Sequence, residues 1–353
     1  MTLDWARVGK GFGRAGLVVY VGLLLSSCVS EPIAPSRPQL TPEEARALIG
    51  RLLPASVPDR PGWVSDIYAA FKGQSLEITP ENVCAVVAVT EQESGFQVNP
   101  VVPGLGAKAW REIDSRAAHA GVPKLVVHGA LALTSSNGRT YGERIDSAKT
   151  EKDLSDVFED FIGSVPMGHT LFGGLNPIRT RGPMQVSVDF AGSSVAEELF
   201  TRRGSLYFGT AHLLSYPAPY DRYLYRFADF NAGRYASLDA GFQKAVSRAS
   251  GIRLVADGSL AGNTESAVRS LMPRLHLDKD EIHAALEKGR SAEFERTQLY
   301  RRVFALAEKA EGRGLPSAAV PDIKLHGPKI TRNLTTYWYA QRVDGRFKRC
   351  LEK

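Results

Sequence analysis

The sequence predicts a mainly α-helical protein, and three observations lead to that prediction. Helix-start signals recur along the chain, apolar residues follow them at spacings of three and four, and strands are favoured only in one short hairpin and in one stretch near the C-terminus. The first start signal is TPEE at 41–44, where threonine can cap the helix, proline suits its first position and the second glutamate completes a capping box. This signal predicts a helix to about residue 53, and a second helix is expected over about 61–72.

The next expected helix starts at Thr79 and ends by presenting a glutamate, Glu93. Thr79 can cap the first turn, Pro80 suits the first helical position, and apolar side chains recur at helical spacing over 83–90. Several of these residues are valines, which are poor helix formers, so burial on several sides must stabilise the helix. Gly95 is a suitable left-handed stop. A carboxylate in the last turn faces the negative end of the helix dipole and apolar neighbours, which favours its protonated form, as a general acid requires.

Three short motifs around and beyond this helix resemble those of the lysozyme-like lytic transglycosylases. ESGF at 93–96, followed by NP at 99–100, resembles the glutamate-serine motif that carries the catalytic acid of that family. RGPMQV at 181–186 resembles its glycine-leucine-methionine-glutamine motif, and FNAG at 230–233 resembles its tyrosine-asparagine-glycine motif. The order of the three motifs is also that of the family. The resemblance implies a lysozyme-like helical domain.

The resemblance also implies roles for individual residues. Glu93 would be the only catalytic acid, with Ser94 beside it in the motif as a substrate-binding residue. Met184 and Gln185 would lie at the floor of the substrate groove, with Gln185 bonding the sugar or orienting the acid. Asn231 would contact an N-acetyl sugar. Alternatively, Gln185 is only a polar residue at the start of an element, and Asn231 only a helix stop.

The chain departs from the family pattern at three places. Pro183 stands where the family prefers leucine, and Phe230, in a substrate-binding position, stands where it has tyrosine. Phenylalanine cannot donate a hydrogen bond to the acid, and Tyr235 is a candidate to replace the missing hydroxyl. The interval of about 101–180 is much longer than in the family core, so it is expected to be a folded insertion.

The expected chemistry is cleavage of the bond between N-acetylmuramic acid and N-acetylglucosamine in peptidoglycan. Glu91 lies about 200° around the helix from Glu93, so both cannot aim into one cleft. One acid suits lytic transglycosylation, which forms a 1,6-anhydro-muramyl end, whereas hydrolysis needs two carboxylates. Asp189 and Asp229 are candidates for a second carboxylate under the hydrolytic alternative. A noncatalytic wall-binding or envelope scaffold protein is the other alternative, favoured by Pro183, Phe230 and the inserted segment.

The remaining segments continue the helical pattern. A short hairpin is expected in the glycine-rich stretch 163–183, and a strand at 329–343, where β-branched and aromatic residues gather. A C-terminal helical extension is expected over about 251–353. Helices are expected within the insertion at about 106–120, 123–133 and 150–162, and after it at about 195–215, 220–230, 238–250, 278–288 and 292–311.

The N-terminus predicts export and lipid attachment. Residues 1–27 combine three basic residues with an apolar run at 15–25 that is too short to span a bilayer, which is typical of a secretory signal. LSSC, ending at Cys28, resembles a lipobox, so Cys28 is expected to carry acyl chains such as palmitate. Val29 after it points to the periplasmic face of the outer membrane, since an aspartate there favours the inner membrane. Residues 28–40 then read as a proline-rich tether to a domain at 41–353.

Charge and cysteine content bear on the kind of partner and on disulfide formation. Loss of residues 1–27 removes three basic residues and one acidic residue, which takes the net charge from +6 to +4. This mild charge is compatible with an anionic glycan and gives no reason to expect nucleic acid. In an oxidising periplasm Cys84 and Cys350 are able to pair, although two free thiols remain the alternative.

No motif for a metal, a cofactor or a serine nucleophile was found, since HExxH, CxxC, GxSxG and a phosphate-binding loop are all missing from the sequence. The expected partners are therefore peptidoglycan strands and, through the lipid, a membrane. The whole chain also resembles an uncharacterised family of bacterial outer-membrane lipoproteins, which implies no activity.

Overall fold

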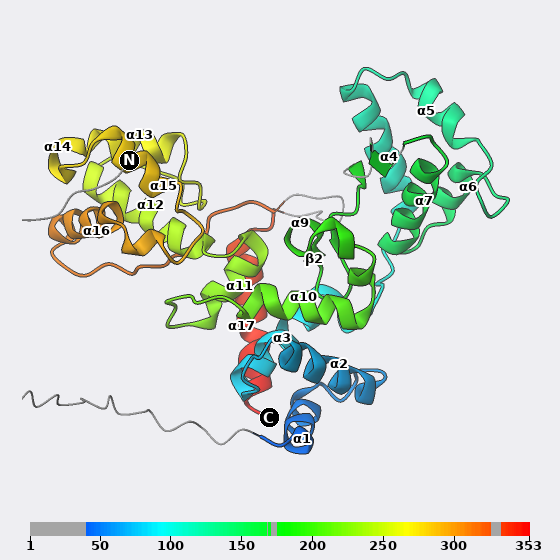
Figure 1. Cartoon of the computed structure of the whole chain (residues 1–353), viewed down its shortest axis with the longest axis horizontal. Helices are drawn as coiled ribbons and strands as arrows, with labels where there is room; N and C mark the ends of the chain where they lie inside the picture. Colours follow the sequence, from blue (N-terminus) through cyan, green and yellow to red (C-terminus); the bar gives the residue numbers. More distant parts are fainter. Residues whose placement is uncertain (1–39, 168, 171–174, 326–332) are drawn as a thin grey trace, which may run out of the picture. The chain divides into compact units, whose positions relative to one another are not determined.

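The computed structural model describes residues 40–167, 169–170, 175–325 and 333–353. Leu40–Lys353 forms one compact unit, separate from Met1–Gln39. The expected signal segment, Cys28 and nearly all of the tether therefore lie outside the described residues. The prediction of a mainly α protein is confirmed, because the described part contains a single two-stranded sheet among many helices (Figure 1).

The first three helices and the last one share a hydrophobic core with two helices from the middle of the chain. We call this the central core; its helices are α1 (Pro42–Leu52), α2 (Arg60–Gly73), α3 (Pro80–Ser94), α10 (Arg202–Leu214), α11 (Tyr223–Ala232) and α17 (Thr336–Leu351). The predicted capping box of α1 is present, with Thr41 and Glu44 each bonding the other's backbone. Every residue of α3 from Val83 to Thr90 is buried, which explains how a valine-rich segment remains helical.

The strand predicted at 329–343 is wrong where the structure describes it. Residues 336–351 form α17, which Thr335 caps through its hydroxyl. Its buried residues Tyr339, Val343, Phe347 and Cys350 recur at helical spacing, so burial of this face prevailed over the β propensity of the aromatic residues. The part of the prediction at 329–332 lies outside the described residues.

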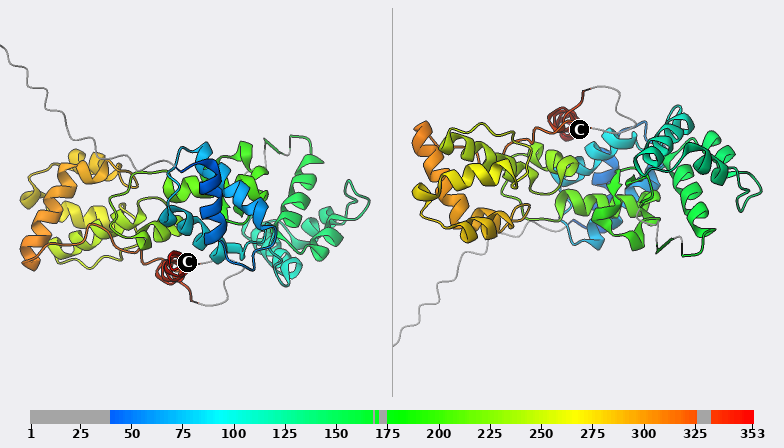
Figure 2. Two further views of the ribbon diagram at one scale, coloured as in Figure 1. Left: turned by 90° about the horizontal axis from the view of Figure 1, so that it is seen from below. Right: turned by 90° about the horizontal axis from the view of Figure 1, so that it is seen from above.

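Helix α17 packs antiparallel against α3 and also contacts α11; it is the red helix of Figure 1 and is seen nearly end-on in Figure 2. A disulfide joins Cys84 near the start of α3 to Cys350 near the end of α17, as one of the two sequence alternatives predicted. Both sulfur-bearing residues are buried. The bond therefore attaches the C-terminus to the helix that ends at Glu93.

The hairpin is formed by β1 (Thr180–Arg181) and β2 (Val186–Ser187), so it lies slightly beyond the predicted stretch. Gly182 occupies a left-handed conformation in its turn, and a Cβ there would lie 1.9 Å from the carbonyl oxygen of Leu199. Only glycine fits this turn. Met184 is fully buried beneath the hairpin and packs against Gly209 of α10. Helix α9 (Val188–Ala191) and the 3-10 turns η2 (Ser193–Val195) and η3 (Glu198–Phe200) lead on to α10.

The predicted insertion is folded around a small core of its own. The sequence located three of its helices within about two residues but missed the short α6, which Thr140 and Glu143 start with a capping box. Its helices are α4 (Leu105–His119), α5 (Lys124–Leu131), α6 (Tyr141–Ser147) and α7 (Glu151–Gly163).

A third core is formed by α12 together with the part of the expected C-terminal extension up to residue 311, whereas α17, in the same predicted range, belongs to the central core. Its elements are α12 (Ala236–Ser250), α13 (Asn263–Ser270), α14 (Met272–Leu275), α15 (Lys279–Leu286), η4 (Phe294–Arg296) and α16 (Gln298–Glu311). Asp239 of α12 is buried here and accepts a hydrogen bond from the Arg290 backbone, while its Oδ1 atom has no partner. Burial raises the pKa of Asp239 to about 7. None of the described helices has the length and apolar character needed to cross a membrane.

Candidate active site

The candidate site begins with Glu93 at the C-terminal turn of α3. Gly95 ends this helix in a left-handed conformation, as predicted. The Glu93 side chain is partly exposed, and the hydroxyl of Tyr339 on α17 donates a hydrogen bond of 2.6 Å to its Oε1 atom. The pKa of Tyr339 is raised well above its ordinary value, first by burial and then by the Glu93 charge. Tyr339 therefore remains a protonated donor, and it holds the carboxylate in one orientation.

Glu91 is held at a different place on the same partner helix. Its carboxylate lies 3.5 Å from the Nε atom of Arg346. Arg346 and Tyr339 are seven residues apart, which is about two helical turns on one face of α17. The two glutamates are thus fixed at separate points, and Glu91 is tied to a guanidinium.

Asn231 is brought to the same end of α17 as Glu93. The hydroxyl of Thr336 donates a hydrogen bond of 2.9 Å to Oδ1 of Asn231, and Thr336 is itself buried. Thr336 and Tyr339 are three residues apart, so their side chains lie about one turn apart on one face. Asn231 is exposed in the last turn of α11. Glu93 and Asn231, from two of the three motifs, therefore both bond to side chains near the start of α17.

Gln185 is held on the hairpin by three contacts of its side chain. Its Oε1 accepts from the Thr180 hydroxyl at 3.0 Å, and its Nε2 donates to the Gly182 carbonyl at 3.1 Å. Its Nε2 also lies 3.4 Å from the carboxylate of Glu151 on α7. These contacts direct the side chain toward the insertion, and they occupy polar atoms that the resemblance assigned to sugar or to the acid.

Three other residues with implied roles in substrate binding make contacts within the fold. The Ser94 hydroxyl donates to the Thr90 carbonyl within α3, and Ser94 is buried. Met184 is fully buried, so it supports the hairpin and cannot touch a sugar. The Tyr235 hydroxyl donates a hydrogen bond of 2.8 Å to the Pro217 carbonyl. This bond uses the hydroxyl that was expected to replace the one of the family's tyrosine.

Phe230 belongs to an aromatic stack that sequence reasoning missed. Its ring lies 5.1 Å from that of His212, and His212 lies 4.5 Å from Phe190. Burial, with the charge of Arg234 as a smaller cause, lowers the pKa of His212 to about 4, so the imidazole is neutral at physiological pH. The stack joins α9, which follows the hairpin, to α11. Glu93 accepts a hydroxyl hydrogen bond from Tyr339 of α17, and Phe230 has no hydroxyl to donate.

Asp229 is excluded as a second catalytic carboxylate. It is buried and accepts hydrogen bonds from the Tyr216 and Tyr220 hydroxyls at 3.0 and 2.7 Å. It also accepts from the backbone amides of Tyr235 and Ser237, so it organises the junction of α11 and α12. Burial raises its pKa despite these bonds. Asp189 is exposed on the short helix α9, where no described contact brings it to Glu93.

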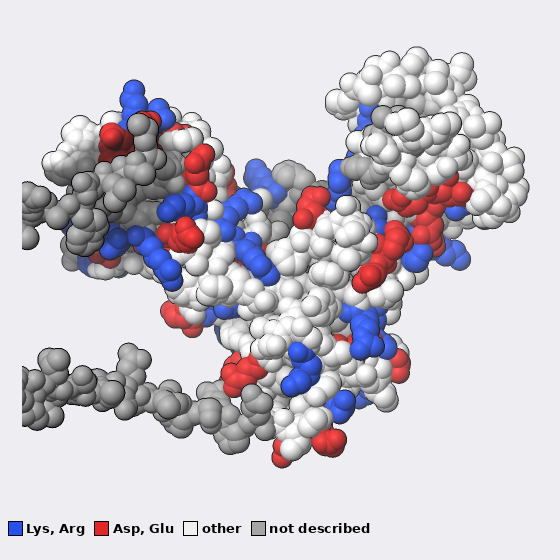
Figure 3. All heavy atoms as spheres, in the orientation of Figure 1, with Lys and Arg blue, Asp and Glu red and all other residues white. Residues whose placement is uncertain are grey.

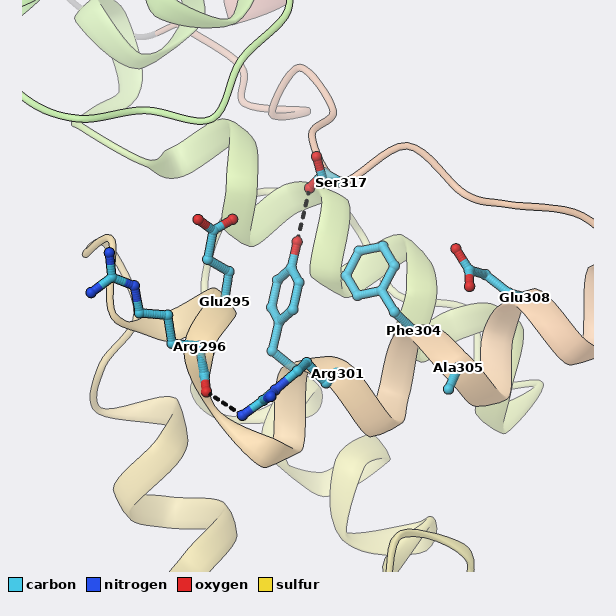
Figure 4. Close-up of a pocket in the computed structure, with 8 residues that line it drawn as sticks. Glu295, Arg296, Arg301, Phe304, Ala305, Glu308 and Ser317 are labelled. Carbon is cyan, nitrogen blue, oxygen red and sulfur yellow. Dashed lines mark hydrogen bonds between the residues drawn. The ribbon is translucent and has the colours of Figure 1, made fainter. Parts of the chain in front are cut away.

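An open surface depression lies elsewhere, along α16. Its volume is about 540 Å³, and the residues that line it include Arg296, Tyr300, Arg301 and Phe304 (Figure 4). The Tyr300 hydroxyl is 3.4 Å from the Ser317 carbonyl that closes one side. None of the candidate catalytic or sugar-binding residues lines it. Across the described residues, no three His, Cys, Asp or Glu side chains come together in a way that could hold a metal ion.

Together the fold and the site define a class: a mainly α protein whose Glu93, at a helix end, is oriented by a tyrosine from the disulfide-bonded C-terminal helix. The comparison with known families identifies the particular family. Residues 56–353 match the model described as "Protein of unknown function (DUF1615)", and the chain belongs to that family. It is 49% identical over 349 residues to "Uncharacterized protein YaiW" of Escherichia coli (strain K12), a match that covers 94% of this chain and 96% of that relative. No solved structure matched the chain. The resemblance to lytic transglycosylases therefore rests on the three motifs alone.

Proposed function

We propose that this protein acts on the peptidoglycan of the bacterial envelope as a lytic transglycosylase, with Glu93 as its single acid and base. The observation that carries the proposal is the hydrogen bond from buried Tyr339 to the partly exposed Glu93 carboxylate. Such an arrangement pre-positions one acid, and positioned acid-base catalysis typically contributes about 100- to 10,000-fold in rate.

In the proposed reaction Glu93 first protonates the oxygen of the glycosidic bond between N-acetylmuramic acid and N-acetylglucosamine. As a carboxylate it then removes the proton of the muramyl 6-hydroxyl, which closes the 1,6-anhydro ring. The attacking group belongs to the substrate, so no second protein carboxylate is required. The pairing of Glu91 with Arg346 and the burial of Asp229 agree with a one-acid mechanism.

Asn231 supports the proposal because its bond to Thr336 brings it to the same end of α17 as Glu93. An exposed amide at this position suits the N-acetyl group of a sugar, which presents one donor and one acceptor. We further propose that Cys28 carries the lipid that anchors the domain to the inner leaflet of the outer membrane, where it faces the periplasm and the wall.

The second candidate function is noncatalytic binding to the wall or to an envelope scaffold. It is favoured by Gln185, whose side chain is held by Thr180, Gly182 and Glu151 rather than directed to Glu93. It is also favoured by the buried positions of Ser94 and Met184. Under this reading the motif segments have kept their structural contacts without turnover.

Digestion of purified sacculi, followed by mass spectrometry of the soluble products, separates the possibilities. Anhydro-muropeptides support the proposed transglycosylase, and new reducing ends would instead show hydrolysis. Intact sacculi that retain bound protein would establish the noncatalytic function. The structure leads us to expect anhydro-muropeptides that increase with the amount of protein.

A further inference from the structure

We propose that α5, at the tip of the insertion, docks the domain on an anionic lipid bilayer. The inference rests on the proposed lipid anchoring but not on catalysis by Glu93. It starts from α5 itself, whose sequence KLVVHGAL is apolar on nearly every side. A helix of this kind requires a cover on both faces.

The protein covers only one of those faces. Leu131 is buried and Val127 packs against the insertion core, while the His128 ring stacks on Trp110 at 4.6 Å. On the other face Leu125 is 84% exposed and Val126 is 59% exposed. Val122 before the helix and Leu133 after it are exposed as well. We call these four side chains, Val122, Leu125, Val126 and Leu133, the apolar tip.

The charge around the apolar tip fits an anionic surface. Residues 115–142 contain three basic residues, Arg116, Lys124 and Arg139, and no aspartate or glutamate. Just before this stretch, Asp114 lies 2.6 Å from the Lys124 amine and 2.8 Å from the His128 ring, and Glu112 lies 2.6 Å from Arg116. Two of the three basic charges are therefore paired with acids, and the surface is only mildly basic. In Figure 3 the visible face of the α5 end shows no acidic side chain, whereas acidic side chains gather over α7, which carries several of them.

The composition of the apolar tip favours lipid over a protein partner. Protein interfaces draw their binding energy mainly from tryptophan, tyrosine and arginine, and leucine and valine are under-represented among such residues. The apolar tip consists of leucine and valine alone. Aliphatic side chains beside basic ones are typical of segments that enter the boundary between headgroups and acyl chains.

Under the proposed anchoring, the short chain before the domain keeps the domain near a bilayer. Between Cys28 and Leu40 there are eleven residues, which together span at most roughly 40 Å when fully extended. A domain anchored through Cys28 therefore lies close to a bilayer. Docking by α5 would supply a second attachment and orient the domain on that surface.

Flotation with vesicles tests the proposal on the compact unit from Leu40 to Lys353, which lacks the lipid. We expect it to float with vesicles of phosphatidylethanolamine and phosphatidylglycerol, and to bind pure phosphatidylcholine less. The double variant Leu125→Ser/Val126→Ser should reduce the bound fraction by about tenfold or more, because two exposed apolar side chains no longer enter the lipid. Val255→Ser is the matched control, since Val255 is 62% exposed outside the apolar tip, and it should bind like the wild type.

A fluorescent variant reports the depth of insertion directly. Lipids with brominated acyl chains should quench the fluorescence of Leu125→Trp more than that of the wild-type unit, which contains only the native Trp63, Trp110 and Trp338. Failure of the wild-type unit to float with either vesicle would overturn the proposal, as would equal flotation of the double variant. Loss of self-association in the double variant, without loss of flotation, would assign the apolar tip to a second copy instead. The vesicles contain no glycan, so these results are independent of the sacculus digestion.

Discussion

Removal of the disulfide should strongly destabilise the protein, because the bond closes most of the described chain into one loop. Cys84 and Cys350 are 266 residues apart in sequence. The double variant Cys84→Ala/Cys350→Ala removes the cross-link without introducing a polar group into the buried site. The variant retains the packing of α17 against α3 but loses the constraint on the unfolded chain.

The magnitude follows from the loop length. In the chain-entropy account, a cross-link that closes a loop of this size lowers the free energy of the folded state relative to the unfolded state by about 5–6 kcal/mol at 25 °C. Native disulfides that are removed typically cost about 2–5 kcal/mol, since the unfolded chain keeps some structure. We therefore expect the free energy of unfolding to fall by at least about 3 kcal/mol.

Urea denaturation with and without a thiol reductant provides the assay. The wild type should lose stability in reductant, and the double variant should be equally unstable in both conditions. The reasoning would be refuted by a double variant with wild-type stability, or by a wild type that is fully reduced and keeps its unfolding midpoint.

Two other predictions concern single buried groups. Asp239→Asn should stabilise the protein by up to about 4 kcal/mol at pH 8 and little at pH 4. The sign follows because the folded-state pKa of about 7 exceeds the unfolded value of 3.8. Ionisation between these pH values therefore costs the folded wild type stability that the variant keeps. Thermal melts in which the variant and the wild type differ by the same amount at pH 4 and pH 8 would contradict this. Tyr339→Phe should lower the free energy of unfolding by about 1.5–3 kcal/mol at pH 7, because a hydrogen bond to the Glu93 carboxylate is lost. The control Tyr337→Phe, on the exposed side of α17, should change it by less than about 0.5 kcal/mol.

Local signals in the sequence predicted the helices well where caps and periodicity agreed. Helix α3 was anticipated at both ends because Thr79, Pro80 and Gly95 each act on their own turn. The prediction failed at α17, where aromatic and β-branched residues favour a strand by propensity. The helical spacing of Tyr339, Val343, Phe347 and Cys350 was the available signal, but its meaning depends on the distant α3 surface that buries this face.

The candidate site shows the same division between local and long-range information. Glu93 was found from its motif and from the helix that carries it. Its partner Tyr339 is 246 residues away, so no local pattern relates the two. Only the structure could exclude Asp229 as a second catalytic carboxylate, because the exclusion depends on its burial and on its hydrogen bonds from Tyr216 and Tyr220. Gln185 was expected to bond the sugar or orient the acid, or to be a polar residue at the start of an element, and its contact with Glu151 depends on how the insertion folds.

The most direct test of the proposed chemistry compares two variants of the same helix end. Glu93→Gln and Glu91→Gln each remove one carboxylate from α3, and circular dichroism should show that both retain the fold. Release of anhydro-muropeptides from sacculi should fall by about 100-fold or more in Glu93→Gln. It should remain close to wild type in Glu91→Gln, whose carboxylate is tied to Arg346. Wild-type release by Glu93→Gln would contradict the assignment of Glu93 as the catalytic acid.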